Sequence, residues 1–321
     1  MSLQTLGEDL ESAVNQTVDD AANALSEQLI DYFADAGNTA ATSAVSTAIG
    51  WGAPRDNGGL FWATYKATVR RQGVFQGASG LRNFNVELTD PLYRELGTPW
   101  EKTFQRRLPA VFQGFSQHTS VILKEFHLGV DENCKAQSPG ISRIDRLRDN
   151  IPVYENAFRN LANSMIININ EAQREVNREF TPSIASAMAK AYNFCSVENG
   201  GYLPLFCRIL LASSLTKNAG RGSYARMKEH MNAHVTETHV TMFENATADV
   251  GDKLAIMCDQ VRKTMSGRVE RMFQEISRDY MTIVGSEPGK DRGIGKSDKL
   301  ARKMVENAIA QSEVAFSEVL D

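Results

Sequence analysis

The side chains best placed to bind a metal are His230, His234 and Glu237. The two histidines are four residues apart, so on a helix they share one face and supply half of a tetrahedral zinc site. The segment reads His-Met-Asn-Ala-His, without the glutamate that a zincin uses as its base. His118 and His127 lie far upstream. We therefore treat these three residues as weak candidates and expect no metal site and no cofactor.

A second candidate is the glycine-rich stretch Gly289–Ser297, which is similar to a phosphate-binding loop. That motif requires a glycine, four residues and then Gly-Lys-Ser/Thr, and it follows a buried strand. Counting back from Gly295, the first required glycine falls on Lys290, and the preceding segment has a helical pattern. The spacing indicates a solvated linker in place of a nucleotide site.

The same region carries six cations close together in the sequence. Such a patch can bind anionic lipid or a phosphate backbone. The chain as a whole has a net charge of −4, which argues against a dedicated nucleic-acid-binding protein. A solvated helix face is the favoured interpretation, and anion binding is the alternative. The six anion-binding candidates are Lys290, Arg292, Lys296, Lys299, Arg302 and Lys303.

The sequence offers little for covalent catalysis. No serine lies in a Gly-x-Ser-x-Gly elbow, and the carboxylates are scattered. Cys195 and Cys258 fall on apolar helical stripes, which favours buried small side chains over nucleophiles. Four cysteines in 321 residues are too sparse for a disulfide scaffold and favour reduced thiols. We therefore expect no catalytic residues and no enzyme activity.

The sequence shows neither a signal-peptide pattern nor a membrane-spanning stretch, which favours a location inside the cell. The segment 1–20 contains five acids and no Lys or Arg, unlike a signal peptide. The most apolar stretch, 202–215, is too short to span a membrane. We expect a cytoplasmic or nuclear protein that is neither secreted nor membrane-spanning.

Apolar residues recur every three or four positions along most of the chain, which predicts amphipathic helices. Gly37-Asn38 is a plausible helix stop, 73–89 resembles a loop, and Asp90-Pro91 is a plausible helix start. Pro99 and Pro109 are expected to break helices, and Thr181-Pro182 to kink or end one. The predicted helices cover 8–36, 61–71, 92–133, 141–195, 223–245, 252–280 and 298–319, with 39–49 as a possible continuation of the first.

Nothing in the pattern predicts a sheet. Long, narrow apolar stripes suit antiparallel helices, so the expected fold is all-α: an elongated antiparallel helical bundle, stalk-like in shape. The length suggests about two domains. We divide the chain into a connecting helix and small-residue stretch (1–49), a helical bundle (50–285), and a basic linker with a C-terminal helix (286–321).

The stretch 51–285 resembles the helical region of fungal dynamin-like large GTPases of the nuclear GTPase SLIP-GC-like group. The similar blocks appear in the family's order and cover about two thirds of the chain. They are GGLFWATYKATVRRQGVF (58–75), NFNVELTDPL (83–92), WEKTFQRRLPAVFQGF (100–115), NREFTPSIASAM (177–188) with Ala191-Tyr192 and Cys195, GSYARMKEHMNAHV (222–235) and RDYMTIVG (278–285).

The resemblance implies a helical part that serves assembly and transmits nucleotide state. It carries over no catalytic residue, because the P-loop, switch residues and base-recognition motif have no counterpart here. In the family pattern the block with Tyr192, Cys195 and Glu198 runs almost directly into 222–228. The intervening apolar residues, 200–219, are therefore interpreted as a lineage-specific insert or a translated intron.

We accordingly expect a non-catalytic assembly or interaction module. Its expected partners are a second copy, another helical protein, or a GTPase domain acting in trans. The alternative is a helical module that binds anionic lipid or nucleic acid through 290–303.

Overall fold

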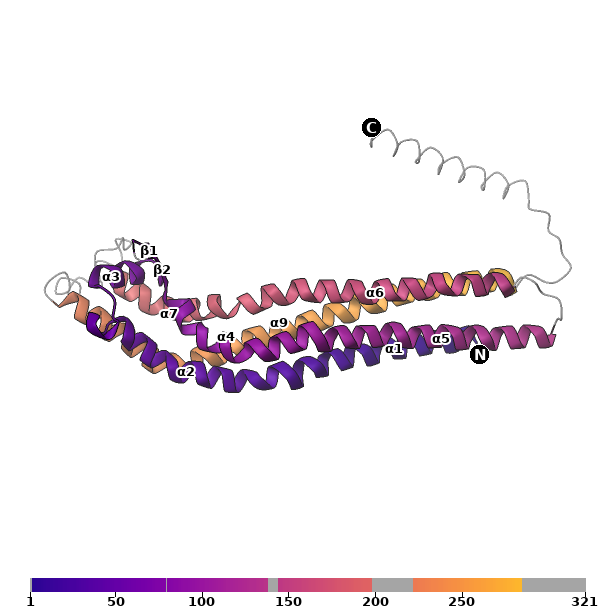
Figure 1. Ribbon diagram of the computed structural model, residues 1–321, viewed down its shortest axis with the longest axis horizontal. Coiled ribbons are helices and arrows are strands. Elements are labelled where there is room, and N and C mark those ends of the chain that lie inside the picture. The colour runs from indigo at the N-terminus through magenta and orange to yellow at the C-terminus, as the bar shows by residue number, and fades with distance from the viewer. Residues whose placement is uncertain (1, 79, 138–143, 198–221, 285–321) are drawn as a thin grey trace, which may run out of the picture.

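The computed structural model describes residues 2–78, 80–137, 144–197 and 222–284. There the chain forms an elongated all-α bundle with one small β-hairpin, which confirms the expected fold class (Figure 1). Four long helical segments run along this rod. The first segment comprises α1 (Leu3–Leu25), the π-helical turn η1 (Ser26–Ile30) and α2 (Asp31–Trp51). The second segment comprises α4 (Phe84–Lys102), the π-helical turn η3 (Thr103–Arg107) and α5 (Leu108–Gln137). The third segment comprises α6 (Ile144–Arg178) and α7 (Phe180–Val197), and the fourth is α9 (Ser223–Val284).

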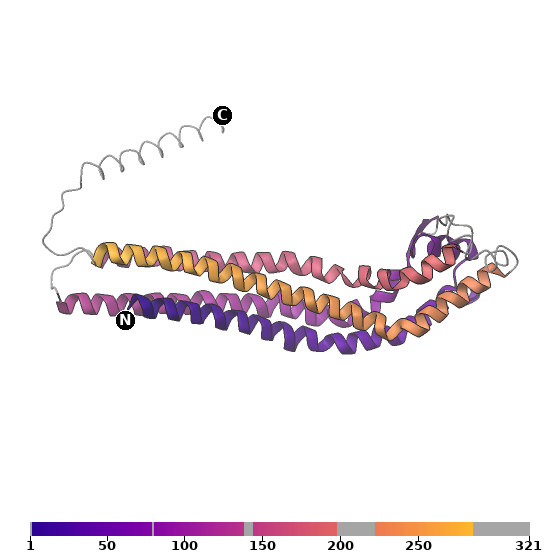
Figure 2. The same ribbon diagram turned by 180° about the vertical axis from the view of Figure 1, so that it is seen from behind.

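Successive segments run in opposite directions, as the two opposite views show (Figures 1 and 2). The first segment packs against the second and the fourth, and the third packs against the same two. The fourth segment is a single helix, because α9 alone has 62 residues and runs along nearly the whole rod. The beginning of α1 and the short helix α3 (Trp62–Arg70) lie toward opposite ends of the rod.

One continuous apolar core runs along the bundle from Leu6 to Tyr280. The stripes expected from the sequence face inward: Met231, Val235 and Met265 are fully buried in α9. A polar outer face and a buried apolar stripe are what make each helix stable in this setting. Within the described residues, every helix is too short or too polar to cross a membrane.

The first helix does not stop at Gly37, contrary to the expectation from sequence. Gly37 is buried and the helix continues to Trp51. The buried face of α2 is made of small residues that pack closely against α9, and this packing offsets the cost of about 1 kcal/mol for a mid-helix glycine. These small buried residues are Ala36, Ala40, Ala41, Ala44 and Ala48. Similarly, 223–245 and 252–280 are parts of one uninterrupted helix.

The stretch 73–89 is not a loop, and Asp90-Pro91 does not begin a helix. Strands β1 (Val74–Gly77) and β2 (Gly80–Asn83) form an antiparallel hairpin in which Val74 pairs with Asn83. Helix α4 then starts at Phe84 because the Asn83 side chain caps it. The sequence did not predict these strands, because each has only four residues and shows no clear alternation of apolar and polar side chains.

The prolines of the second segment interrupt it only in part. Pro99 lies within α4, so the break expected there is absent. The regular α-helix ends shortly afterwards, where the π-helical turn η3 begins. Pro109 is the second residue of α5, so its missing N–H falls next to this turn. The helix is interrupted close to Thr181-Pro182 but not at it, because α6 ends at Arg178 and α7, which contains both residues, starts at Phe180.

The rod bends near these interruptions (Figures 1 and 2). π-Helical turns are a recognised cause of helix kinks. Phe180, fully buried at the start of α7, contacts aromatic rings from two other segments. Its ring centroid lies 5.9 Å from that of Phe33, 5.8 Å from that of Tyr93 and 6.4 Å from that of Trp100. This aromatic cluster fills the core at the bend.

Candidate functional site

Several candidates from the sequence lie outside the described residues. These are the phosphate-loop-like stretch 289–297, the apolar insert 200–219 and all six anion-binding candidates. The last group consists of Lys290, Arg292, Lys296, Lys299, Arg302 and Lys303.

The histidine candidates lie on α9 but face separate partners. The ring of His230 stacks on Phe194, with centroids 4.0 Å apart. Nε2 of His234 lies 3.0 Å from the carbonyl oxygen of Ala187, within hydrogen-bonding distance. Glu237 is exposed. Across the described ranges, no three His, Cys, Asp or Glu side chains are grouped as metal ligands.

The two described cysteine side chains are packed into the bundle. Cys195 is buried, with Sγ 4.0 Å from the Met227 carbonyl oxygen. Burial raises the pKa of the Cys258 thiol to about 11, so the thiol stays protonated at neutral pH. Because the thiolate is the nucleophilic form, the surroundings of Cys258 disfavour nucleophilic chemistry.

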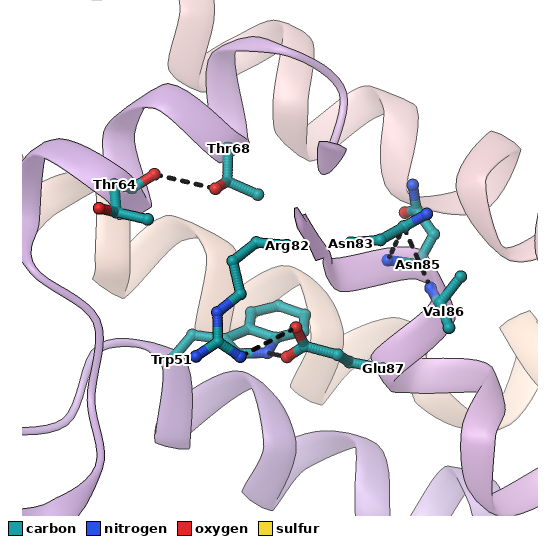
Figure 3. Close-up of polar contacts among 8 residues, drawn as sticks. All are labelled: Trp51, Thr64, Thr68, Arg82, Asn83, Asn85, Val86 and Glu87. Carbon is teal, nitrogen blue, oxygen red and sulfur yellow. Dashed lines mark hydrogen bonds and ion pairs between the residues drawn. The ribbon is translucent and has the colours of Figure 1, made fainter. Parts of the chain in front are cut away.

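The most elaborate polar contacts are at the end of the rod formed by α3 and the hairpin (Figure 3). We call residues 51–87, from the end of α2 to the start of α4, the end module. Trp51 Nε1 donates a hydrogen bond to Glu87 Oε2 at 2.7 Å, and Arg82 Nη1 lies 3.7 Å from Glu87 Oε1. The Trp51 ring also stacks on Phe84, with centroids 3.9 Å apart. These contacts join α2, the hairpin and α4.

A second set of contacts closes the corner between α3 and β1. Gln72 and Gly73 both have positive φ, 56° and 85°, which turns the chain sharply. Asn85 Nδ2 donates to the Gln72 carbonyl oxygen at 3.0 Å, while Asn85 Oδ1 accepts from Tyr192 Oη at 2.9 Å. Asn83 Oδ1 accepts from the backbone N–H groups of Asn85 and Val86. The asparagines therefore serve the fold of the turn (Figure 3).

Buried side chains on one face of α3 hold this helix against the rest of the protein. Tyr65 is fully buried and its ring lies 5.6 Å from those of Phe84 and Tyr224. Burial raises the pKa of its phenol far above the ordinary value. The buried Thr68 hydroxyl donates to the Thr64 carbonyl oxygen at 2.8 Å. The exposed residues of α3 are Trp62 at its beginning and Arg70 at its end.

The start of α3 carries two large aromatic residues at the surface. Phe61 and Trp62 are 49% and 52% exposed, and their rings lie 5.7 Å apart. The Arg55 guanidinium lies over the Phe61 ring at 6.0 Å from its centroid. Lys66 is half-buried one turn after Trp62 and shares its helix face. We call Arg55, Phe61, Trp62 and Lys66 the aromatic-cationic knob.

The knob is part of a wider concentration of exposed apolar side chains at this end. Exposed aromatic rings beside cations are typical of interaction surfaces rather than of a folded core. The exposed large apolar residues of the end module and its surroundings are Ile49, Phe61, Trp62, Val74, Leu81, Val86 and Phe194.

A groove of about 480 Å³ lies between the beginning of α1 and the last part of α9. Its apolar floor includes Leu10 and Phe273, and its carboxylates are Glu8, Glu11 and Glu270. A Cβ added to Gly7 would come within 3.1 Å of the Phe273 ring, so the small residue lets the ring lie against α1. We call this hollow the acidic groove.

Sequence patterns indicated α3 but neither the knob nor the groove. The helix expected over 61–71 corresponds to α3, and the periodicity showed no reason for Phe61 and Trp62 to face outward. The glutamates and Phe273 come together only through the packing of α1 on α9. Local sequence spacing cannot reveal a pairing between the first and the last described helix of the chain.

Residues 51–202 match the family model described as a domain of unknown function, DUF7605. The match covers somewhat less than half of the chain and begins at Trp51, so all eight residues in Figure 3 fall within it. No curated protein matches the chain. No solved structure matches it either.

Proposed function

We propose that the chain is a non-catalytic helical module that works by self-association, with the end module as a contact surface. The observation that carries this proposal is the exposure of two adjacent aromatic rings, Phe61 and Trp62, at the end of a long helical rod. Aromatic residues are enriched in protein interfaces and dominate binding energy there.

The architecture supports the same role. The long bundle has one continuous core, and its ends and sides are available to partners. Exposed apolar side chains are denser around the end module than along the rest of the rod. The resemblance of 51–285 to the helical region of dynamin-like GTPases agrees with assembly as the function. It adds a GTPase domain in trans as a further proposed partner.

The test removes the two rings without weakening the fold. Phe61 is the N-cap of α3 and makes no capping hydrogen bond, so Phe61→Ser adds a favourable cap while removing apolar surface. Trp62→Ser changes an exposed position. We expect the double variant to keep its melting temperature but to show weaker concentration-dependent self-association by light scattering.

A control variant exchanges two equally exposed apolar residues on the shaft. Leu128 and Val153 are 58% and 62% exposed, so Leu128→Ser/Val153→Ser removes a comparable exposure elsewhere. We expect this control to associate like the wild type. If the Phe61/Trp62 double variant associates as strongly as the wild type, the end module is not the contact surface.

The alternative function, binding of anionic lipid or nucleic acid through 290–303, depends on cations outside the described residues. No contact in the described part of the chain favours it.

A further inference from the structure

We infer that the aromatic-cationic knob of one copy docks in the acidic groove of a second copy, so that molecules join head to tail. The inference rests on the proposed self-association and names its two surfaces. Four observations carry it: the charge of the knob, the charge of the groove, the apolar content of both, and their positions on the rod.

The knob and one wall of the groove come from stretches of the sequence with opposite charge. Residues 1–54 contain eight acids and no Lys or Arg, whereas residues 55–82 contain five cations and one acid. The knob lies in the second stretch, and one wall of the groove is made by the first. Complementary charge of this kind steers association and selects the partner surface.

Within the described part of the molecule, the groove carboxylates have no cationic partner. Glu8 accepts a hydrogen bond from Gln4 Nε2 at 3.0 Å, and Glu270 accepts one from Gln274 Nε2 at 2.8 Å. No Lys or Arg of the described ranges forms an ion pair with these two or with Glu11. The groove therefore presents three carboxylates for which an incoming cation is a favourable neighbour.

The apolar content of the two surfaces matches as well. An aromatic side chain needs an apolar wall, and Phe273 and Leu10 provide one in a hollow of about 480 Å³. On the knob, Trp62 and Lys66 project from the same face of α3, one turn apart. An aromatic ring can therefore enter the groove while a cation meets the carboxylates at its rim.

The knob cannot reach the groove of its own molecule. An unbroken helical run from Glu11 to Trp51 holds the two surfaces apart along the rod, because a helix of this length cannot fold back on itself. They lie toward opposite ends of the rod (Figures 1 and 2). A contact between two different surfaces is heterologous and extends into chains unless its rotation closes a ring. The knob comprises four residues, against roughly 20–30 residues a side in a standard stable interface, so we expect the association to be weak and reversible.

The experiment is sedimentation velocity of the full chain with reversed charges. The knob variant is Arg55→Glu/Lys66→Glu and the groove variant is Glu11→Lys/Glu270→Lys. We expect each variant alone to weaken self-association by about tenfold or more, because like charges then face each other. The control, Glu244→Lys/Asp252→Lys, reverses two exposed carboxylates in the middle of α9 and should associate like the wild type.

Mixing the two variants gives the decisive result. In an equimolar mixture the normal knob of the groove variant meets the normal groove of the knob variant, and the reversed knob meets the reversed groove, so both contacts are complementary. We expect the mixture to recover self-association and to form chains in which the two variants alternate. A variant carrying all four reversals should again form chains, since its charges are complementary once more.

Other outcomes overturn the inference while sparing the proposed function. Loss of association in the knob variant alone, with no recovery on mixing, would indicate a knob-to-knob contact. An effect of the groove variant alone would assign the groove to another occupant, such as the cations of 290–303. Equal loss in the control variant would mean that net charge, and not the groove, governs association.

Discussion

The indole of Trp51 lies flat on the ring of Phe84, with centroids 3.9 Å apart and planes inclined by 5°. Trp51 is the last residue of α2 and Phe84 the first of α4. The stack therefore closes the end module at its base. Glu87 completes the junction by accepting a hydrogen bond from the indole N–H at 2.7 Å.

Removing the stack should destabilise the protein substantially. Both rings are buried, so we expect Trp51→Ala to cost about 3–5 kcal/mol in the free energy of unfolding, as for other large core truncations. Trp51→Phe keeps a ring but loses the bond to Glu87, and should cost less. Urea unfolding followed by circular dichroism measures both. Equal losses for the two variants would assign the stability to the hydrogen bond.

The turn at Gly73 should tolerate no side chain. Its φ is 85°, and an added Cβ would lie 2.5 Å from Tyr192 Oη. We expect Gly73→Ala to cost more than the roughly 1–2 kcal/mol that a left-handed alanine costs by itself. Gly80 is the matched control, because its φ is 106° but its Cβ would meet open space. Thermal melts that rank Gly80→Ala as the more damaging change would refute the packing of Tyr192 on this turn.

Sequence periodicity predicted the long helices well because each buries a regular apolar stripe. It failed where tertiary packing overrides local preference, as at Gly37, where small residues pack on α9. It also failed at 74–83, since two four-residue strands are too short for a periodic signal. The Asn83 cap could have been noticed, because asparagine before an apolar helix is a known start signal.

The buried stripe of α9 can be tested by introducing charge. Met231 is fully buried and Val261 is 8% exposed, so an aspartate at either site enters the core without a partner. We expect Met231→Asp and Val261→Asp each to lower the free energy of unfolding by several kcal/mol. Ile256→Asp, on the same helix but 56% exposed, should have a small effect. Unchanged melting of the first two variants would show that these side chains do not lie in the core.

The contacts between Glu155 and its neighbours should make the free energy of unfolding depend on pH. The Ser120 hydroxyl donates to Oε1 of Glu155, and Lys124 Nζ lies 2.9 Å from the same atom. These contacts lower the pKa of Glu155 below its ordinary value, the Ser120 hydrogen bond most strongly. The stabilisation is therefore full above the unfolded pKa of about 4.3 and is lost as the pH falls through the lower folded value.

Glu155→Gln removes this dependence. Because Lys124 is largely exposed, we expect a loss of about 1 kcal/mol or less at neutral pH, shrinking toward zero in strong acid. Glu125→Gln serves as the control, because it changes an exposed carboxylate on α5, the helix that carries Ser120 and Lys124. Denaturant titrations at several pH values measure the difference. A loss that grows on acidification would have the wrong sign for a stabilising carboxylate.

The candidate site could be predicted from the sequence less well than the fold. His230 and His234 attracted attention by spacing, yet each contacts a different group across the bundle. The exposed pair Phe61 and Trp62 has the same apolar character as core residues, and only the direction of α3 reveals that both rings face solvent. Surfaces made by residues on separate helices leave no local pattern in the chain.

The most direct test of self-association is sedimentation velocity of the wild-type chain over a wide range of protein concentration, with and without GTP. We expect the average mass to rise with concentration, to fall at high salt, and to be unaffected by GTP. A strictly monomeric protein at every concentration would contradict the proposed function. A shift that requires GTP would instead contradict the absence of a nucleotide site that we expect for 289–297.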